Sequence, residues 1–181
     1  HGLDWQRDKW NWFEKKIFYA VSKFAVMQND NLVVVSEKLA NDIAKYYRRS
    51  ATVIRPGMPK LGKATHKTRM KRQVTTKSYI LYLGRITREK NIHLLVDCFK
   101  QLQKLTNKYQ LVIAGARPNT NSYYEFLQKK SERNKNIIWF GHASRQQKSW
   151  LHRNAILTTS LSSLEGLSLS LLESISIGKY S

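Results

Sequence analysis

Two basic residues follow an apolar run in the middle of the chain. Residues 79–83, Tyr-Ile-Leu-Tyr-Leu, are followed by Gly84, Arg85 and, five positions later, Lys90. The run predicts a buried strand, and in open α/β sheets ligands bind beyond the carboxyl ends of the strands. Two cations there, beside the start of a helix, suit a diphosphate. The alternative interpretation is two ordinary exposed cations on a basic protein.

Two isolated carboxylates lie near the end of the chain. After Glu132 the acidic residues are Glu165 and Glu173. Leucines at helical spacing predict a helix that begins near Gly166, which places Glu165 in the preceding loop and Glu173 two turns inside. The separation is about 12 Å along a helix, whereas two carboxylates that act on one bond stand about 5 to 9.5 Å apart. The pair therefore suits two hydroxylated parts of one extended ligand. Alternatives are a capping acid with a surface acid, or a strand in this Leu/Ser-rich run.

The remaining reactive residue types show no pattern of their own. The histidines lack the spacing of zinc ligands, so no metal site is predicted, and His93 and His142 are interpreted as structural. Cys98 stands among apolar residues and is predicted to lie in the core. The sequence contains neither a P-loop nor a G-x-S-x-G motif.

Composition limits the class of protein. The 181 residues carry 32 Lys plus Arg against 12 Asp plus Glu, a formal charge of +20, which indicates a polyanionic partner such as nucleic acid, an anionic membrane or a phosphorylated ligand. One cysteine excludes a disulfide scaffold. The sequence has no apolar run of about 20 residues and no signal-peptide pattern. Because it begins with His1, we expect a segment of a longer reading frame.

Strand and helix patterns alternate along most of the chain, which predicts βαβ units and a parallel sheet. Predicted strands occupy residues 31–36, 51–54, 79–83, 110–114, 137–140 and 155–159. Predicted helices occupy residues 5–27, 37–47 (with Ser36 as N-cap), 91–105, 121–133, 145–152 and 166–177. We interpret residues 1–58 as the end of one α/β domain, 59–77 as a basic linker, and 78–181 as most of a second domain.

Taken in order, these motifs resemble GT-B glycosyltransferases of family 4. The motifs of the carboxyl-terminal half are Gly84-Arg85 with Lys90, Leu111–Gly115, Trp139–Gly141, and Glu165 with Glu173. Those similar to the end of the amino-terminal domain, notably in bacterial sugar transferases that build surface polysaccharides, are His1–Trp5, Val33–Ser36 and Val53–Gly57. The resemblance implies two Rossmann-like parallel-sheet domains, both incomplete here: an acceptor-side domain first and a nucleotide-sugar donor-binding domain second.

The resemblance also implies an activity and roles for single residues. A sugar would pass from a nucleotide-sugar donor, the co-substrate, to a saccharide or lipid-linked acceptor in polysaccharide or glycoconjugate biosynthesis, with retention and with neither metal nor other cofactor. The implied diphosphate-binding residues are Arg85, Lys90, Gly166 and Leu167. Glu173 would bind the donor ribose, and the implied catalytic residues are Glu165, at the sugar, and His1, near sugar and acceptor.

Three further interpretations stay open. The glycine-rich loop that opens this family is not in the sequence, so the chain could be a non-catalytic remnant or half of a split enzyme. The aromatic and basic residues 5–24 are typical of a helix on an anionic bilayer or of an ordinary core helix, and a cytoplasmic protein peripheral on the inner face of the cell membrane is expected. The charge alone favours a nucleic-acid-binding module, but the aromatics concentrate outside the basic linker, so no nucleic acid is expected.

Overall fold

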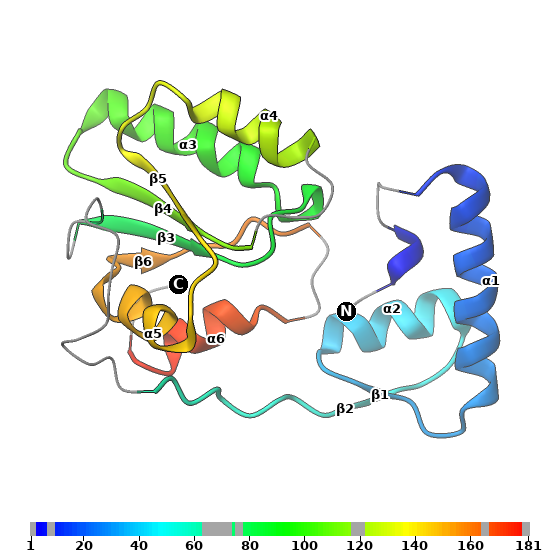
Figure 1. Ribbon diagram of the computed structural model, residues 1–181. Coiled ribbons are helices and arrows are strands. Elements are labelled where there is room, and N and C mark those ends of the chain that lie inside the picture. Colours follow the sequence, from blue (N-terminus) through cyan, green and yellow to red (C-terminus); the bar gives the residue numbers. More distant parts are fainter. Residues whose placement is uncertain are drawn as a thin grey trace. The chain divides into compact units, whose positions relative to one another are not determined.

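The computed structural model describes residues 3–6, 10–62, 74, 78–116, 122–163 and 167–178. The chain divides into two compact units (Figure 1): His1–Gly57 with Ser163–Ser168, and Met58–Ser162 with Leu169–Ser181. The predicted linker 59–77 lies largely outside the described residues, and the predicted domain limits stay predictions.

The second unit is built on a parallel sheet of four strands. The strands are β3 (Tyr79–Leu83), β4 (Gln110–Ala114), β5 (Ile137–Gly141) and β6 (Leu157–Thr158), in the order β5-β4-β3-β6. The chain therefore builds outward from β3 through β4 to β5 and then returns to the other side of β3 with β6. Such a reversal of strand order, here between β3 and β6, is where open α/β sheets bind ligands, outside the carboxyl ends of the strands.

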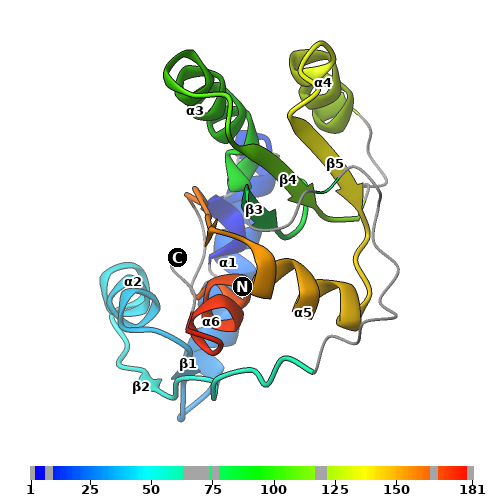
Figure 2. The ribbon, with the colours of Figure 1, turned by 90° about the vertical axis from the view of Figure 1, so that its left-hand side faces the viewer.

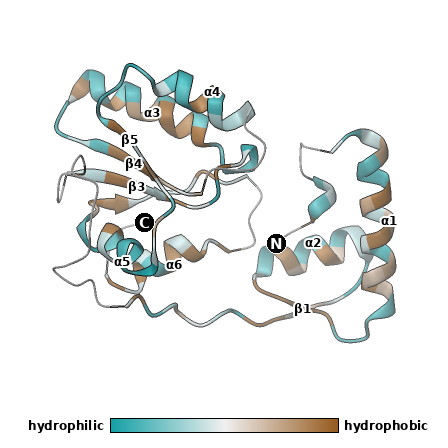
Figure 3. Cartoon of the chain, viewed as in Figure 1, coloured by the Kyte–Doolittle hydropathy of each residue, from teal (hydrophilic) through white to brown (hydrophobic). Residues whose placement is uncertain are grey.

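Helices cover both faces of this sheet (Figure 2). On one face lie α3 (Ile92–Leu105) and α4 (Ser122–Ser131), and on the other lie α5 (Arg145–Asn154) and α6 (Leu169–Ile175). Leu111 and Ile113 of β4 pack with α3 and α4, whereas Val112 packs with Leu151 of α5. Because successive strand residues point to opposite faces, a continuous apolar run is needed here, and Figure 3 shows the strands as largely hydrophobic.

The predicted elements of this unit are all present in the structure, most of them with bounds within two residues of the prediction, but several predictions differ from it. The strand predicted at 155–159 is reduced to β6, which pairs with β3 alone. The Leu/Ser-rich run forms a helix rather than a strand, but α6 begins at Leu169 and not near Gly166. The core position predicted for Cys98 is wrong, because Leu95 and Phe99 face the core from α3 and turn Cys98 to solvent. His142, interpreted as structural, is exposed after β5.

Tyr79 ties the central strand to α5. It is fully buried, and its hydroxyl donates a 2.6 Å hydrogen bond to the carbonyl oxygen of Leu151. Burial raises the pKa of Tyr79, so the hydroxyl stays a neutral donor at physiological pH.

We expect Tyr79→Phe to lower the free energy of unfolding by about 1 kcal/mol, because the Leu151 carbonyl would lose a buried hydroxyl donor and keep only the backbone amide of Ala155. Urea unfolding of the two proteins measures this. Equal stability would mean that the Ala155 amide alone satisfies the Leu151 carbonyl and that the tyrosine hydroxyl adds nothing.

The first unit joins two short parallel strands to two helices. Its elements are η1 (Asp4–Gln6), α1 (Trp12–Gln28), β1 (Val33–Val34), α2 (Glu37–Tyr47) and β2 (Thr52–Val53). The Ser36 hydroxyl accepts from the amide of Leu39, as predicted for the N-cap of α2. The helix predicted from residue 5 begins only at Trp12, because Asn11 and Glu14 form a capping box there.

The aromatic residues of α1 divide between core and surface. Tyr19 contacts Trp5, whose indole N–H donates to the Tyr47 hydroxyl at 2.9 Å. Trp12 and Phe24, by contrast, are 70% and 67% exposed. Trp5 and Tyr19 therefore belong to the core of this unit, and the bilayer interpretation of the exposed aromatic residues stays a prediction. A search of the helices in the described ranges finds none with the length and apolarity to cross a bilayer.

Candidate functional site

Arg85 stands immediately beyond the carboxyl end of β3. Its side chain is exposed, and its carbonyl oxygen accepts a 2.7 Å hydrogen bond from the buried Tyr82 hydroxyl. The Gly84 amide donates to the Ala114 carbonyl, which continues the β3–β4 ladder by one residue. The backbone at Arg85 is thus fixed from two sides while its guanidinium stays open to solvent.

Lys90 ends a short 3₁₀ helix, η2 (Arg88–Lys90), that links β3 to α3. The residue is only 8% exposed. Asn91 follows in a left-handed conformation with φ of 51°, and this turn directs the chain into α3. A positive charge held at low dielectric acts on an anion more strongly than an exposed one does. Lys90 is therefore the stronger electrostatic element of this loop.

Two hydrogen bonds join the loop after β3 to the loop after β6. The Asn91 side-chain amide donates to the Leu161 carbonyl at 2.9 Å, and the Ser162 hydroxyl donates to the Glu89 carbonyl at 3.3 Å. These loops follow the two strands at which the strand order reverses. The structure thus has Arg85 and Lys90 beyond the carboxyl end of β3, as the sequence predicts, and the strand order makes this the switch point of the sheet.

Glu173 lies on α6, which packs against α5 and β6. Its side chain is 20% exposed, and one carboxylate oxygen, Oε2, lies 3.3 Å from Nε2 of the fully buried His152. The other oxygen makes no hydrogen bond or ion pair with any described residue, so it can accept one from a ligand.

The other predicted site residues are less completely placed. His1, Glu165 and Gly166 lie outside the described residues, and Leu167 is half-buried in the segment before α6. Their roles stay predictions. The separation of Glu165 from Glu173 by about 12 Å no longer follows from helical rise, because α6 begins only at Leu169 and Glu173 lies about one turn from that start, not two. Sequence reasoning missed His152, Asn91 and Ser162. Apart from the contact of His152 with Thr158, their partners lie 21 to 73 residues away along the chain, and no local spacing indicates such contacts.

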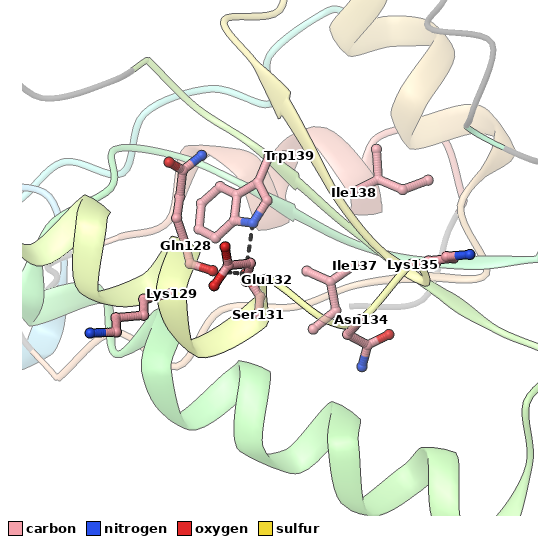
Figure 4. Close-up of a pocket in the computed structure, with 9 residues that line it drawn as sticks. All are labelled: Gln128, Lys129, Ser131, Glu132, Asn134, Lys135, Ile137, Ile138 and Trp139. Carbon is pink, nitrogen blue, oxygen red and sulfur yellow. Dashed lines mark hydrogen bonds between the residues drawn. The ribbon is translucent and has the colours of Figure 1, made fainter.

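A separate cavity opens at the other end of the sheet (Figure 4). Its lining residues include Gln128, Ser131, Glu132 and Asn134, and Trp139 of β5 donates its indole N–H to the Ser131 hydroxyl at 2.9 Å. These residues surround the end of α4 and the amino end of β5. Because parallel sheets bind ligands at their carboxyl ends, this cavity is not the candidate site.

The described histidines form no metal centre. His93 is half-buried, and its ring nitrogen Nδ1 lies 2.9 Å from the Tyr123 hydroxyl, a contact between α3 and α4 that agrees with a structural interpretation. The described residues bring no three His, Cys, Asp or Glu side chains together in a cluster that could hold a metal ion.

The comparisons identify relatives of this fold. None of the curated proteins matches the chain. Sucrose-phosphate synthase from Thermosynechococcus elongatus superposes with a TM-score of 0.77 and 19% identity, over 98% of this chain and 46% of that chain. Anabaena HepE, solved in complex with UDP and glucose, superposes with a TM-score of 0.76 and 16% identity, over 91% of this chain and 47% of that chain. The pneumococcal O-GlcNAc transferase GtfA, in complex with UDP and GlcNAc, superposes with a TM-score of 0.62 and 19% identity, over 90% of this chain and 31% of that chain.

This chain thus spans less than half the length of the solved proteins that it resembles. The likeness confirms the predicted α/β fold of GT-B type with parallel sheets. The sequence model of glycosyl transferases group 1 matches residues 65–180, well over half of the chain. The chain belongs to the glycosyl transferases group 1 family.

Proposed function

We propose that this chain binds the donor in a glycosyltransferase that moves a sugar from a nucleotide-sugar to a saccharide or lipid-linked acceptor. The observation that carries the proposal is the placement of Arg85 and Lys90 beyond β3, at the switch point of the sheet. The UDP and sugar named for the complexes of HepE and GtfA support a nucleotide-sugar as the ligand class.

The two cations would act on the leaving group. As the bond between the sugar and the diphosphate breaks, negative charge grows on the diphosphate oxygens. A guanidinium and a buried ammonium at fixed positions stabilise that charge without waiting for solvent to reorganise. They supply the positive charge that a divalent metal would otherwise provide, which supports metal independence. Retention, with the leaving phosphate assisting the acceptor on the same face, is part of the proposal.

Glu173 would bind the donor ribose. Its free carboxylate oxygen can accept hydrogen bonds from a pair of ribose hydroxyls, and its partial burial strengthens them. Glu165 at the sugar, His1 near the acceptor, and the amides of Gly166 and Leu167 at the diphosphate complete the proposed site.

A role in polysaccharide or glycoconjugate biosynthesis and an anionic membrane as partner belong to the same proposal. The exposed Trp12, Phe13 and Phe24 on α1, beside Lys15 and Lys16, favour a membrane surface. Sedimentation with vesicles of anionic lipid measures the binding of the chain to a membrane. Absence of binding at low salt would remove the membrane from the proposal.

Calorimetric titration of the chain with UDP and with GDP, without metal, tests the donor site. We expect saturable binding of one nucleotide, and we expect Glu173→Ala to weaken it about tenfold through the lost ribose contact. Glu132→Ala, an exposed carboxylate at the other end of the sheet, is the matched control and should leave the affinity unchanged.

Two results would contradict the proposal. If the folded chain binds neither nucleotide, the donor site is not formed, which favours a non-catalytic remnant or half of a split enzyme. If it binds an oligonucleotide more tightly than either nucleotide, the charge of +20 serves nucleic-acid binding instead.

A further inference from the structure

A fully buried histidine contacts the proposed ribose-binding carboxylate. His152 lies in the last turn of α5, with its Nδ1 3.2 Å from the hydroxyl of the buried Thr158 on β6. Its Nε2 lies 3.3 Å from Oε2 of Glu173 on α6. One imidazole thus bridges the strand and the helix on either side of the loop that leads to α6. We propose that His152 is a positioning residue that holds the carboxylate of Glu173 toward the ribose of a bound nucleotide.

The hydrogen-bonding chemistry of the three groups is consistent with one orientation. A carboxylate only accepts hydrogen bonds, so the imidazole must carry its proton on Nε2 to interact with Glu173. A threonine hydroxyl can both donate and accept, so Thr158 satisfies Nδ1 whether or not that nitrogen is protonated. The Nε2 contact is within ion-pair distance but is not aligned as a hydrogen bond, and Nε2 has no other polar partner among the described residues.

The turn that carries His152 is itself fixed. The Tyr79 hydroxyl donates to the carbonyl of the preceding residue, Leu151, and the Ala155 amide donates to the same carbonyl at 3.0 Å. The imidazole therefore approaches Glu173 from the rigid part of the unit, whereas α6 is short and adds few intrahelical bonds of its own. A flexible glutamate gains a defined rotamer from such a contact, and preorganisation of that kind increases affinity.

Stability alone is a weak explanation for this contact. A buried ion pair often contributes less than an apolar pair of similar volume would, because both groups lose their hydration. Glu173, in addition, keeps one oxygen directed to no described partner and is partly exposed. The inference rests on the proposed function, since it assumes that the exposed oxygen meets a ribose.

The test compares UDP with 2′,3′-dideoxy-UDP, which lacks the ribose hydroxyls. His152→Phe keeps a ring in the buried space but removes both polar contacts, and it should weaken UDP binding about tenfold. Binding of the dideoxy nucleotide should not change. His152→Gln places an amide N–H near the position of Nε2 and should restore most of the UDP affinity. In a protein that already carries Glu173→Gln, His152→Phe should cause no further loss.

A matched control separates positioning from loss of stability. Ser131→Ala removes a buried hydroxyl at the other end of the sheet, which should lower the unfolding midpoint and leave both affinities unchanged. Equal weakening of UDP and dideoxy-UDP by His152→Phe, or no weakening of either, would overturn the inference alone. Failure of the unsubstituted folded chain to bind UDP or GDP would overturn the proposed function and the inference together.

Discussion

Lys90→Met is expected to weaken UDP binding by about 10- to 100-fold, more than any other single loss of charge at this site. Lys90 is 8% exposed, so its ammonium acts on the diphosphate through little water. Methionine keeps the apolar stem and nearly the same volume, so the packing of the loop between β3 and α3 should survive. Calorimetric titration with UDP measures the effect, with the fold monitored by circular dichroism.

Arg85→Gln is expected to have a smaller effect that depends on salt. The Arg85 side chain is exposed, so mobile ions screen its charge. At low ionic strength the loss should approach that of Lys90→Met, and at about 0.5 M salt it should nearly vanish, whereas the loss at Lys90 should persist. The larger effect of Lys90 on UDP affinity thus follows from its burial. The sequence motif treats the two cations alike and does not predict which matters more.

Uridine and Lys104→Met serve as controls for both variants. Uridine has no phosphate, so its binding should not respond to either substitution. Lys104 is exposed near the far end of α3, about 18 Å along the helix from its start, and its replacement removes the same charge. If Lys104→Met weakens UDP binding as much as Lys90→Met does, the effect is one of net charge and the diphosphate site is elsewhere.

The placement of these cations could be predicted because it depends on local pattern. An apolar run of five residues followed by glycine indicates where β3 ends, and Arg85 must follow it. The start of α2 was likewise predictable, because Ser36 is one of the residue types preferred at the N-cap of a helix. The error at Cys98 also has a local cause. Consecutive residues of a helix point in different directions, so Phe99 of α3 is buried while the adjacent Cys98 faces solvent.

The strand order and the contacts of His152 could not be predicted in this way. The pairing of β6 with β3 rather than with β5 makes the switch point, and nothing in the four apolar runs specifies that order. His152 meets Thr158 and Glu173 only after α5, β6 and α6 have packed together. Long-range packing of this kind leaves no period in the sequence, so the histidine looks like any other in a basic protein.

Gly115→Ala is expected to damage both the stability of the second unit and nucleotide binding. A Cβ on Gly115 would lie 2.1 Å from the backbone carbonyl oxygen of Gly84 and 3.1 Å from a side-chain carbon of Ile86. No rotamer change relieves a clash with backbone, so the Gly84 carbonyl must move. Gly84 directly precedes Arg85, and its amide is bonded to β4, so the movement disturbs the ladder and the diphosphate loop together.

We expect the free energy of unfolding to fall by about 3 kcal/mol, the upper part of the usual range for overpacking, and UDP affinity to fall with it in whatever fraction stays folded. Gly62→Ala is the matched control, because no atom lies within 4 Å of the added carbon, and it should change stability by no more than about 0.5 kcal/mol. Urea unfolding and UDP titration of both variants measure the two effects. A Gly115→Ala protein with normal stability and weakened UDP binding would show that the loop at Arg85 moves to relieve the clash. That loop would then be more flexible than the β3–β4 ladder. If Gly115→Ala changed neither the free energy of unfolding nor the UDP affinity, the carboxyl ends of β3 and β4 would be free to move apart. The loop after β3 would then not be a preformed binding site.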